Sequence, residues 1–386
     1  MIGVQEFRAE VRGWLADNLV GEFAALKGLG GPGREHEAFE ERRAWNQRLA
    51  AAGLTCLGWP QEHGGRGLSV AHRVAFYEEY AIANAPAKIN HFGEELLGPT
   101  LIAYGTPEQQ QRFLPKILGV TELWCQGYSE PGAGSDLANV STTAELDGDQ
   151  WMINGQKVWT SLAHWAQWCF VVARTEKGSK RHTGLSYLLV PLDQPGIEIR
   201  PIVQLTGDSE FNEVFFDDAR TDADLVVGEP GDGWRVAIGT LTFERGVSTL
   251  GQQIEYAREL SGVAELAKRT GADDDPLIRE RLIRSWAGLR TMRSYALATM
   301  DVEDGRQAAG KDSVSKLLWA NWHRDLGEIA MDVLGREGLT LTGGDFSEWQ
   351  RLYLFSRSDT IYGGSNEIQR NIIAERVLGL PREVKG

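Results

Sequence analysis

Apolar residues recur at helical spacing through the first third of the chain. Two such sets are Phe7, Val11, Trp14 and Leu15, and Tyr77, Tyr80 and Ala81. Intervals of three and four residues place these side chains on one face of a helix. Thr106 followed by Pro107 predicts a further helix start, because a hydroxyl can cap the first turn and proline suits its first position.

The pattern changes between about Glu122 and Val227. Short apolar runs alternate there with turn residues, and the clearest runs are Trp168–Ala173, Leu185–Val190 and Glu213–Phe216. Runs of this length, bounded by turns, predict strands. Asp147-Gly148-Asp149 and Asn154-Gly155 are typical of hairpin turns. We therefore expect a β domain in the middle of the chain.

From Trp234 onward the helical pattern returns in four or five long segments, which indicates a bundle. Asp275-Pro276 predicts the start of one helix, and the acidic run Asp273–Asp275 suits the positive end of its dipole or simply a solvated loop. The predicted fold is an α+β multidomain protein. It has a helical domain over residues 1–120, a β domain over 121–228 and a helical bundle over 229–386.

Composition narrows the function. The 386 residues carry a net charge of −14, which argues against a nucleic-acid partner. No segment is long and apolar enough to span a bilayer and no signal peptide is recognisable, so we expect a cytoplasmic protein without membrane contact. Cys56, Cys125 and Cys169 lack metal-site spacing and are interpreted as buried, reduced thiols. The seven histidines form no metal motif, so no metal site is predicted.

The sequence Gly28-Leu29-Gly30-Gly31-Pro32-Gly33 formally matches the dinucleotide-binding pattern. That pattern needs a strand before it and a helix opening within it. A helical segment precedes it here and Pro32 interrupts it. We interpret the stretch as a loop that binds no dinucleotide.

Three motifs carry candidate chemistry: Tyr128–Asp136 (YSEPGAGSD), Lys157–Ser161 (KVWTS) and Ile361–Arg370 (IYGGSNEIQR). In the first, small residues let a ligand approach the backbone and serine hydroxyls can hydrogen-bond it; an ordinary β-turn has the same features. In the second, Trp159 offers an aromatic face beside two hydroxyls, which suits a flavin ring or a strand-end core. Glu244-Arg245 is either a surface ion pair or a functional carboxylate beside an arginine.

In this order the three motifs resemble the signatures of the acyl-CoA dehydrogenase family, and the resemblance extends over essentially the whole chain. It also includes Gly58-Trp59-Pro60 and Gly105–Gln109. The resemblance implies an N-terminal helical domain, a middle β-barrel-like domain and a C-terminal four-helix bundle, with FAD between the last two and reaching a subunit interface. It implies a homo- or hetero-oligomer, in the form of a tetramer.

By position, the resemblance assigns most of the site. Contacts with FAD fall on Tyr128, Ser129, Ser135, Trp159, Thr160, Ser161, Ser365 and Glu367. Substrate contacts fall on Ser135 and Arg245.

One departure from the family concerns the base. Many members carry a glutamate where this chain has Gly363, and a glycine cannot remove a proton. A minority place the glutamate on the long helix before an arginine, as Glu244-Arg245 stands here. We therefore expect Glu244 to take the α proton, helped by a pKa raised through burial under the substrate. The backbone N–H of Gly363 remains as a donor to the enolate oxygen.

A second departure concerns the distal part of FAD. The usual Arg-x-x-Phe-Gly is replaced by Arg269–Ala272, and Gly-Gly-x-Gly by Gly335–Gly338. Other residues, such as Arg279, would have to rebuild those contacts.

The resemblance implies FAD-dependent α,β-dehydrogenation of an acyl-CoA thioester, in fatty-acid or sterol side-chain catabolism. Electrons would pass to an electron-transferring flavoprotein. Two alternatives stay open: an acyl-CoA oxidase or flavin monooxygenase on the same fold, and a non-catalytic partner subunit of a hetero-oligomeric dehydrogenase. The sequence does not identify the acyl group.

Overall fold

The computed structural model describes residues 2–243, 248–299, 305–341 and 343–381, and the side chains of 248–250 and 305–309 are excluded from the description. The chain divides into two compact units that do not follow chain order. The helical unit comprises Met1–Leu19, Val70–Ala85 and Gly246–Gly386, and the sheet unit comprises Val20–Ser69 and Pro86–Arg245.

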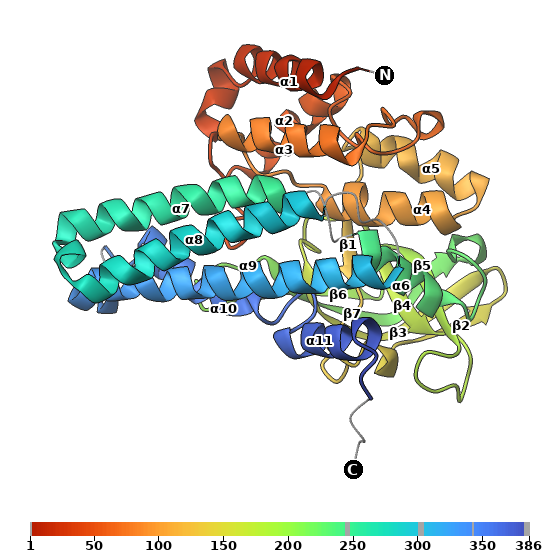
Figure 1. Cartoon of the computed structure of the whole chain (residues 1–386). Helices are drawn as coiled ribbons and strands as arrows, with labels where there is room; N and C mark the ends of the chain where they lie inside the picture. The colour runs from red at the N-terminus through yellow and green to blue at the C-terminus, as the bar shows by residue number, and fades with distance from the viewer. Residues whose placement is uncertain (1, 244–247, 300–304, 342, 382–386) are drawn as a thin grey trace. The chain divides into compact units, whose positions relative to one another are not determined.

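Long helices dominate the helical unit (Figure 1). Its helices are α1 (Val4–Asn18), α3 (Val70–Ile82), α7 (Ser248–Thr270), α8 (Pro276–Ala298), α9 (Gly305–Leu334), α10 (Glu348–Asp359) and α11 (Asn366–Asn371). Short turns of helix complete it: η6 (Ala272–Asp274), η7 (Gly335–Leu339) and the π-helix η8 (Ile372–Val377).

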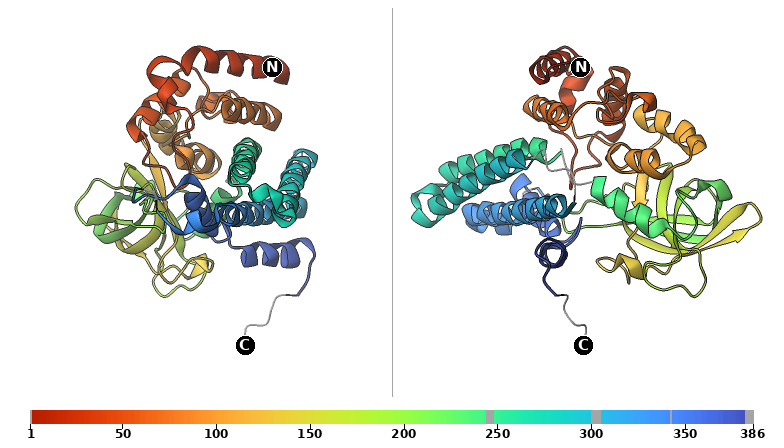
Figure 2. Two further views of the ribbon diagram at one scale, coloured as in Figure 1. Left: turned by 90° about the vertical axis from the view of Figure 1, so that its left-hand side faces the viewer. Right: turned by 45° about the vertical axis from the view of Figure 1, so that its right-hand side comes forward.

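Helices α7 to α10 form the predicted bundle, which Figure 2 shows from two further directions. Its core is apolar and includes Leu260, Val263, Leu326, Ile329 and Trp349. Helix α3 packs on α7, and α1 packs on α3. Arg8 and Arg12 of α1 bind Glu79 of α3 at 2.9 Å, so ion pairs as well as apolar contacts join these helices.

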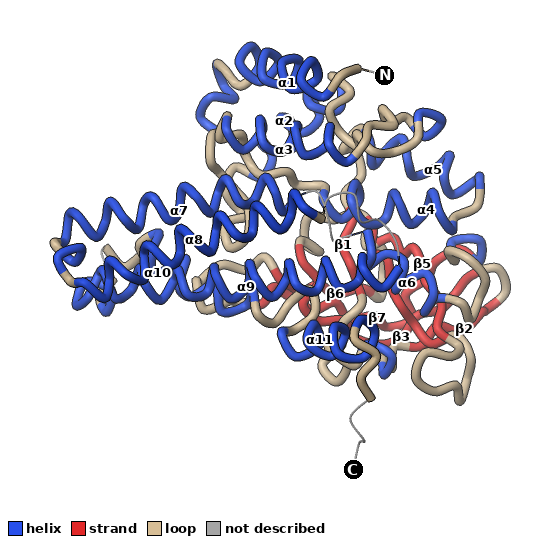
Figure 3. Tube along the Cα trace, viewed as in Figure 1, coloured by secondary structure: helices blue, strands red, loops and turns tan. Residues whose placement is uncertain are grey.

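The strands, red in Figure 3, all lie in the sheet unit. They are β1 (Trp124–Gly127), β2 (Thr143–Asp147), β3 (Gln150–Ser161), β4 (Trp168–Arg174), β5 (Leu185–Pro191), β6 (Ile197–Ile202) and β7 (Phe211–Asp222). The sheet order is β1-β4-β2-β3-β7-β6, with β5 paired to β4. β1 and β4 are parallel, whereas β3 and β7 form a long antiparallel pair.

The same unit also contains helices. They are η1 (Gly21–Leu26), α2 (Phe39–Ala51), η2 (Gln61–His63), the π-helix η3 (Phe92–Leu97), α4 (Gly98–Tyr104), α5 (Pro107–Leu118), η4 (Leu137–Asn139), η5 (Ala223–Leu225) and α6 (Gly233–Phe243).

Side chains alternate between two apolar cores along β4, so this strand is buried on both faces. Phe170 and Val172 pack into a core shared with η3, α4, α5 and α6. Cys169 and Val171 point into a second core, which β2, β3, β5 and β7 share. Successive side chains of a strand point to opposite faces, so a strand with apolar residues at every position is buried on both sides.

The sequence predicted most of these elements correctly. The N-terminal helical, middle β-rich and C-terminal helical order is confirmed. Thr106 caps α5, accepting the Gln109 N–H at 3.2 Å, and Asp275 caps α8, accepting the Leu277 N–H at 2.8 Å. All three cysteines are buried and free. Residues 28–33 lie in a loop that follows a short helix, as expected.

The prediction of a hairpin turn at Asn154-Gly155 was wrong. Both residues lie within β3, where the register with β7 shifts between Ile153 and Gly155. Gly155 has φ +152°, and an added Cβ would stand 2.5 Å from the Thr142 hydroxyl oxygen. Glycine therefore marks a bulge with close backbone approach rather than a chain reversal.

Candidate active site

A buried ion pair joins the first two candidate motifs. Lys157, on β3, is fully buried, and its Nζ donates to Glu130 Oε1 at 2.8 Å. The same ammonium donates to the carbonyls of Tyr128 at 3.1 Å and Val172 at 2.8 Å. Three acceptors match the three protons of the ammonium group. The contacts fix the loop after β1 against strands β3 and β4.

Glu130 organises its own loop as well. Its carboxylate accepts the Ser141 N–H at 2.6 Å, the Ser141 hydroxyl at 2.7 Å and the Thr142 N–H at 2.9 Å. Burial alone would raise the pKa of Glu130, but the charge of Lys157 and these hydrogen bonds lower it to about 2. The carboxylate therefore stays ionised and holds the loop at neutral pH.

Immediately after Lys157, β3 bulges and turns Trp159 outward. The register with β7 shifts between Lys157 and Thr160, and Trp159 has φ +60°. Its side chain is 58% exposed, with one edge contact to Phe211 at 6.0 Å between ring centroids. A left-handed backbone is uncommon for tryptophan and persists only where the surroundings hold it. The strand thus presents a large aromatic face to solvent.

Thr160 and Ser161 follow this face. The Thr160 hydroxyl oxygen is buried and has no hydrogen-bond partner among the described residues. The Thr160 carbonyl accepts from Asn212 Nδ2 at 3.0 Å, which fixes the strand end. Across the site, the Ser129 carbonyl accepts the Val158 N–H at 2.9 Å, so the two motifs meet through the backbone. Ser135 lies in the same loop and is exposed.

These groups fit a flavin. An isoalloxazine ring offers an apolar face and in-plane nitrogen and oxygen atoms, and the site offers an exposed indole beside an unpartnered hydroxyl. Tyr128 differs from the other predicted contacts because it is buried, with its ring edge-on to Phe170 and Tyr187. The predicted roles of these residues stay predictions.

The third motif belongs to the helical unit. Gly363 has φ +60° and lies in an exposed loop between α10 and α11. Its carbonyl accepts from Gln369 Nε2 at 3.1 Å, and its N–H has no hydrogen-bond partner within the described residues. Ser365 caps α11 by accepting the Ile368 N–H at 3.4 Å. The side chain of Glu367 is 76% exposed in the first turn of α11.

Glu244 and Arg245 lie outside the described residues. Helix α6 ends at Phe243 and α7 begins at Ser248, so the predicted base and its neighbouring arginine fall between two described helices. Arg279, considered for the distal FAD contacts, is exposed near the start of α8 and donates to the Asp274 carbonyl at 3.3 Å.

Sequence reasoning missed the structural partners of these motifs. Glu130 lies in the first motif and Lys157 in the second. A lysine at an inward-facing position of a strand could have indicated that a buried carboxylate lies nearby. His323 and Asp359, which form a buried pair in the helical unit, gave no signal because 36 residues separate them.

Carboxyl groups are also buried where the loop of residues 28–33 meets the start of β7. Glu210 is 8% exposed, and its carboxyl group accepts the Gly33 N–H at 2.7 Å. Burial, with the nearby charges of Glu35 and Asp208, raises the pKa of Glu210 from 4.5 to about 8. The folded protein therefore keeps this group protonated at neutral pH.

We expect Glu210 to make folding stability fall between pH 4.5 and 8. The unfolded chain loses the proton near pH 4.5 but the folded protein keeps it, so each pH unit in this window costs up to about 1.4 kcal/mol. Glu210→Gln retains an acceptor for Gly33 and does not titrate. Urea unfolding at pH 5.5 and 8 should show a smaller loss of stability for this variant than for the wild type. Glu213→Gln, three residues further along the chain in β7, is the control; an equal pH trend in all three proteins would contradict the assignment.

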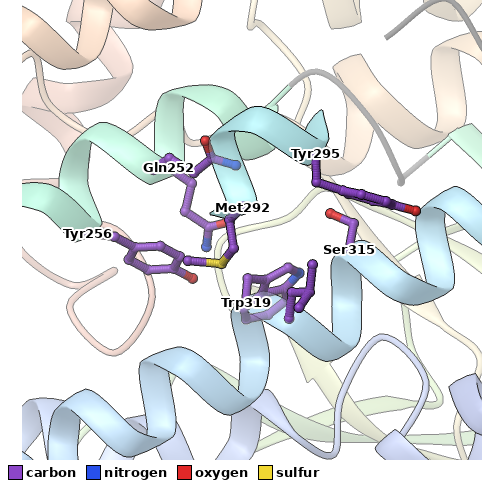
Figure 4. A pocket seen from close by; sticks show the side chains of 8 residues that line it. Gln252, Tyr256, Met292, Tyr295, Ser315 and Trp319 are labelled. Atoms are coloured by element: carbon purple, nitrogen blue, oxygen red, sulfur yellow. The ribbon is translucent and has the colours of Figure 1, made fainter. Parts of the chain in front are cut away.

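A small pocket lies between α7, α8 and α9 (Figure 4). It is lined by Gln252, Gln253, Tyr256, Met292, Tyr295, Ser315, Leu318 and Trp319. None of the predicted site residues contributes to it.

The described residues contain no group of three or more histidine, cysteine, aspartate or glutamate side chains that could hold a metal ion. Among them, no helix has the length and apolarity needed to cross a membrane.

Three family models match successive parts of the chain. The acyl-CoA dehydrogenase N-terminal domain matches residues 4–120, the middle domain 125–219 and the C-terminal domain 231–378. Among curated proteins, acyl-CoA dehydrogenase IpdE1 of Mycolicibacterium smegmatis is 85% identical, over 100% of both chains.

Solved structures agree. The Tcur3481–Tcur3483 steroid ACAD superposes with a TM-score of 0.83 at 29% identity, covering 98% of each chain. The ChsE4–ChsE5 complex from Mycobacterium tuberculosis gives a TM-score of 0.81 at 30% identity, again over 98% of each chain. Together with the motifs and the three-part fold, these matches show that the chain belongs to the acyl-CoA dehydrogenase family, oxidoreductases whose general reaction is the FAD-dependent dehydrogenation of an acyl-CoA thioester.

Proposed function

We propose that this protein binds FAD and removes the α and β hydrogens of an acyl-CoA thioester whose acyl group is a steroid-derived side chain. The observation that carries the proposal is the bulge in β3, which presents the Trp159 indole beside the unpartnered Thr160 hydroxyl. The steroid assignment is supported by the likeness to a solved structure named as a steroid ACAD.

The residues divide the work as follows. Trp159 would stack on the flavin, and Thr160, Ser161, Ser129 and Ser135 would hydrogen-bond it or the substrate. Ser365 and Glu367 would contact its adenosine end, and Tyr128 would support the ring from within the sheet unit. When bound, FAD would accept the β hydrogen as a hydride, that is, with the electron pair of its C–H bond.

Proton removal is assigned to Glu244, with Arg245 beside it contacting the substrate. Removing the α proton leaves negative charge on the thioester oxygen. Gly363 is an exposed residue and its N–H has no acceptor among the described residues, so this N–H is available to donate to that oxygen. Fixed donors aimed at developing charge are among the largest contributions to catalysis.

We further propose that the protein works as a tetramer with a related chain and passes its electrons to an electron-transferring flavoprotein. The likeness to a solved two-chain complex supports the hetero-oligomer. An alternative is a non-catalytic subunit of such an assembly. Gly363 in place of the usual glutamate and the altered Arg269–Ala272 segment favour that alternative.

The test is anaerobic reduction of the flavin by acyl-CoA thioesters. We expect a steroid-type CoA ester to bleach the flavin absorbance and to yield the α,β-unsaturated thioester. Protein purified alone and in complex should be compared, because a non-catalytic subunit would contribute no flavin reduction in either preparation. Rapid oxygen consumption during turnover would instead favour an oxidase.

A further inference from the structure

The loop that carries Gly363 is held from two sides within the helical unit. On one side, Gln369 Nε2 donates to the carbonyls of Gly363 at 3.1 Å and Gly364 at 3.3 Å. On the other, the Tyr362 hydroxyl donates to Asp359 Oδ1 at 2.6 Å. Tyr362 directly precedes Gly363, so this second contact fixes the peptide whose N–H belongs to Gly363.

Lys316 of α9 supports the same side of the loop. Its Nζ donates to the Asp359 carbonyl at 2.7 Å and stands 4.5 Å from the centroid of the Tyr362 ring. The ammonium is also 4.0 Å from the centroid of the Trp319 ring. A cation between two aromatic rings restricts the orientation of both.

Asp359 is in turn held by a buried histidine. Its side chain is 2% exposed, and Asp359 Oδ2 lies 2.5 Å from His323 Nδ1. The other ring nitrogen, Nε2, lies 3.0 Å from Glu259 Oε2 on α7. Tyr256 stacks on the imidazole with ring centroids 4.7 Å apart. Each ring nitrogen thus faces a carboxylate, which requires both to carry protons.

The charge state of the imidazole follows from these partners. Burial alone would lower the pKa of His323, but its hydrogen bonds to Asp359 and Glu259 raise it to about 10. The imidazolium is therefore present throughout the physiological range. It fixes the Asp359 carboxylate, one oxygen of which remains directed at Tyr362.

We propose that His323 and Asp359 are positioning residues of the reaction, which act through Tyr362 to aim the Gly363 N–H at the thioester oxygen. This inference rests on the proposed function of Gly363. A buried charged network is weak evidence for stability, because apolar residues of similar volume often serve as well. Here the chain of contacts from His323 through Asp359 ends at Tyr362, the residue directly before the proposed donor Gly363. A role in positioning the Gly363 N–H explains why the contacts end there.

The sharpest variant is Tyr362→Phe, which removes one hydroxyl from a partly exposed ring. Asp359→Asn removes the charge at the other end of the same hydrogen bond. Tyr353→Phe is the matched control, since it removes a phenolic oxygen from α10 and leaves the Asp359 contacts intact. Flavin content and thermal unfolding of each variant would be measured alongside the wild type.

The probe is acetoacetyl-CoA, a β-ketoacyl thioester whose bound enolate places charge on the oxygen that Gly363 would meet. Its ionisation on the flavin-loaded protein can be followed by ultraviolet absorbance as a function of pH, without turnover. A misplaced donor stabilises the enolate less. We therefore expect the apparent enolate-forming equilibrium to weaken about tenfold or more in Tyr362→Phe and Asp359→Asn. Tyr353→Phe should match the wild type.

Kinetics give a second readout. Flavin reduction by substrate should slow about 10- to 100-fold in both network variants, with little change in the substrate concentration for half-saturation. The double variant Tyr362→Phe/Asp359→Asn should be no slower than Asp359→Asn alone, because both act through one hydrogen bond.

The outcomes separate the two proposals. If the wild type neither ionises acetoacetyl-CoA nor is reduced by any thioester, the proposed function fails and the inference with it. If the wild type does both and Tyr362→Phe equals Tyr353→Phe, the inference alone is overturned. If Tyr362→Phe and Asp359→Asn lose thermal stability but ionise acetoacetyl-CoA as the wild type does, the network serves folding. That result would also overturn the inference.

Discussion

Glu244→Gln is expected to lower the rate of flavin reduction by acyl-CoA by about 10²- to 10⁴-fold, the range typical of a lost general base. Glutamine keeps the shape and the hydrogen-bonding atoms of glutamate but cannot accept the α proton at neutral pH. The variant should retain FAD and bind substrate. Stopped-flow absorbance under anaerobic conditions measures the reduction step itself.

Glu255→Gln is the control for this variant, because Glu255 is an exposed glutamate on α7. It should be reduced at the wild-type rate. If Glu244→Gln were also reduced at that rate, Glu244 would be a surface ion-pair partner of Arg245 and not the base.

A converse variant tests whether the loop still reaches the α carbon. Gly363→Glu in the Glu244→Gln background should restore part of the activity. Gly363 has φ +60°, a conformation that other residues adopt at a cost of about 1 kcal/mol or more. The recovery is therefore expected to be incomplete.

Glu367 is a poor substitute for Glu244 as the base. The pKa of Glu367 is held below its ordinary value by its own backbone N–H and by the Ser365 hydroxyl, which both favour the charged form. A base for an α proton needs the opposite shift. In protein saturated with FAD, Glu367→Gln should therefore leave the rate of the reduction step nearly unchanged, whatever the variant does to the affinity for FAD.

Lys157→Met is expected to destabilise the protein by about 3–5 kcal/mol, because it leaves the buried Glu130 carboxylate without its cation. The Tyr128–Asp136 loop would also lose the contacts that the Lys157 ammonium makes with Tyr128 and Glu130, so FAD binding should weaken. Urea unfolding and flavin content of the purified variant measure the two effects.

Arg220→Met supplies the comparison. The Arg220 side chain is 43% exposed and pairs with Asp147 at 3.2 Å in the same sheet, and exposed pairs contribute about 0–1 kcal/mol. Glu130→Gln in the Lys157→Met background should recover part of the stability, since it removes the unpaired charge. Equal losses in Lys157→Met and Arg220→Met would show that the buried pair contributes no more than a surface one.

Because the pKa of Glu130 is low in the folded protein, folding stability should depend on pH in the acid range. The folded group titrates near pH 2 and the unfolded group near 4.5, so its stabilisation is complete above about 4.5 and is lost as the pH falls toward 2. Acid unfolding of Lys157→Met should lack this contribution.

Local signals in the sequence predicted the elements well. Thr106-Pro107 and Asp275-Pro276 identified two helix starts because capping depends on residues within one turn. Trp168–Ala173 and Leu185–Val190 identified β4 and β5 because a doubly buried strand is apolar at every position. The prediction at Asn154-Gly155 was wrong because this dipeptide occurs both in hairpin turns and in β-bulges. Only the close approach of Thr142 to Gly155 in the folded chain distinguishes the two.

Contacts distant in sequence could not be predicted in this way. The carboxylate of Glu130 meets Lys157 across 27 residues, and Glu210 meets Gly33 across 177. Such contacts depend on strand register and loop path, which a single sequence does not specify. The candidate flavin residues were found through resemblance, and the structure adds the ion pair and the bulge that hold them.

The most direct measurement is anaerobic titration of the flavin-loaded protein with a steroid-derived acyl-CoA thioester, followed by absorbance and by analysis of the product. We expect stoichiometric bleaching of the flavin and formation of an α,β-unsaturated thioester. A flavin that stays oxidised with every thioester tested, in the protein alone and in complex with its partner chain, would contradict this expectation.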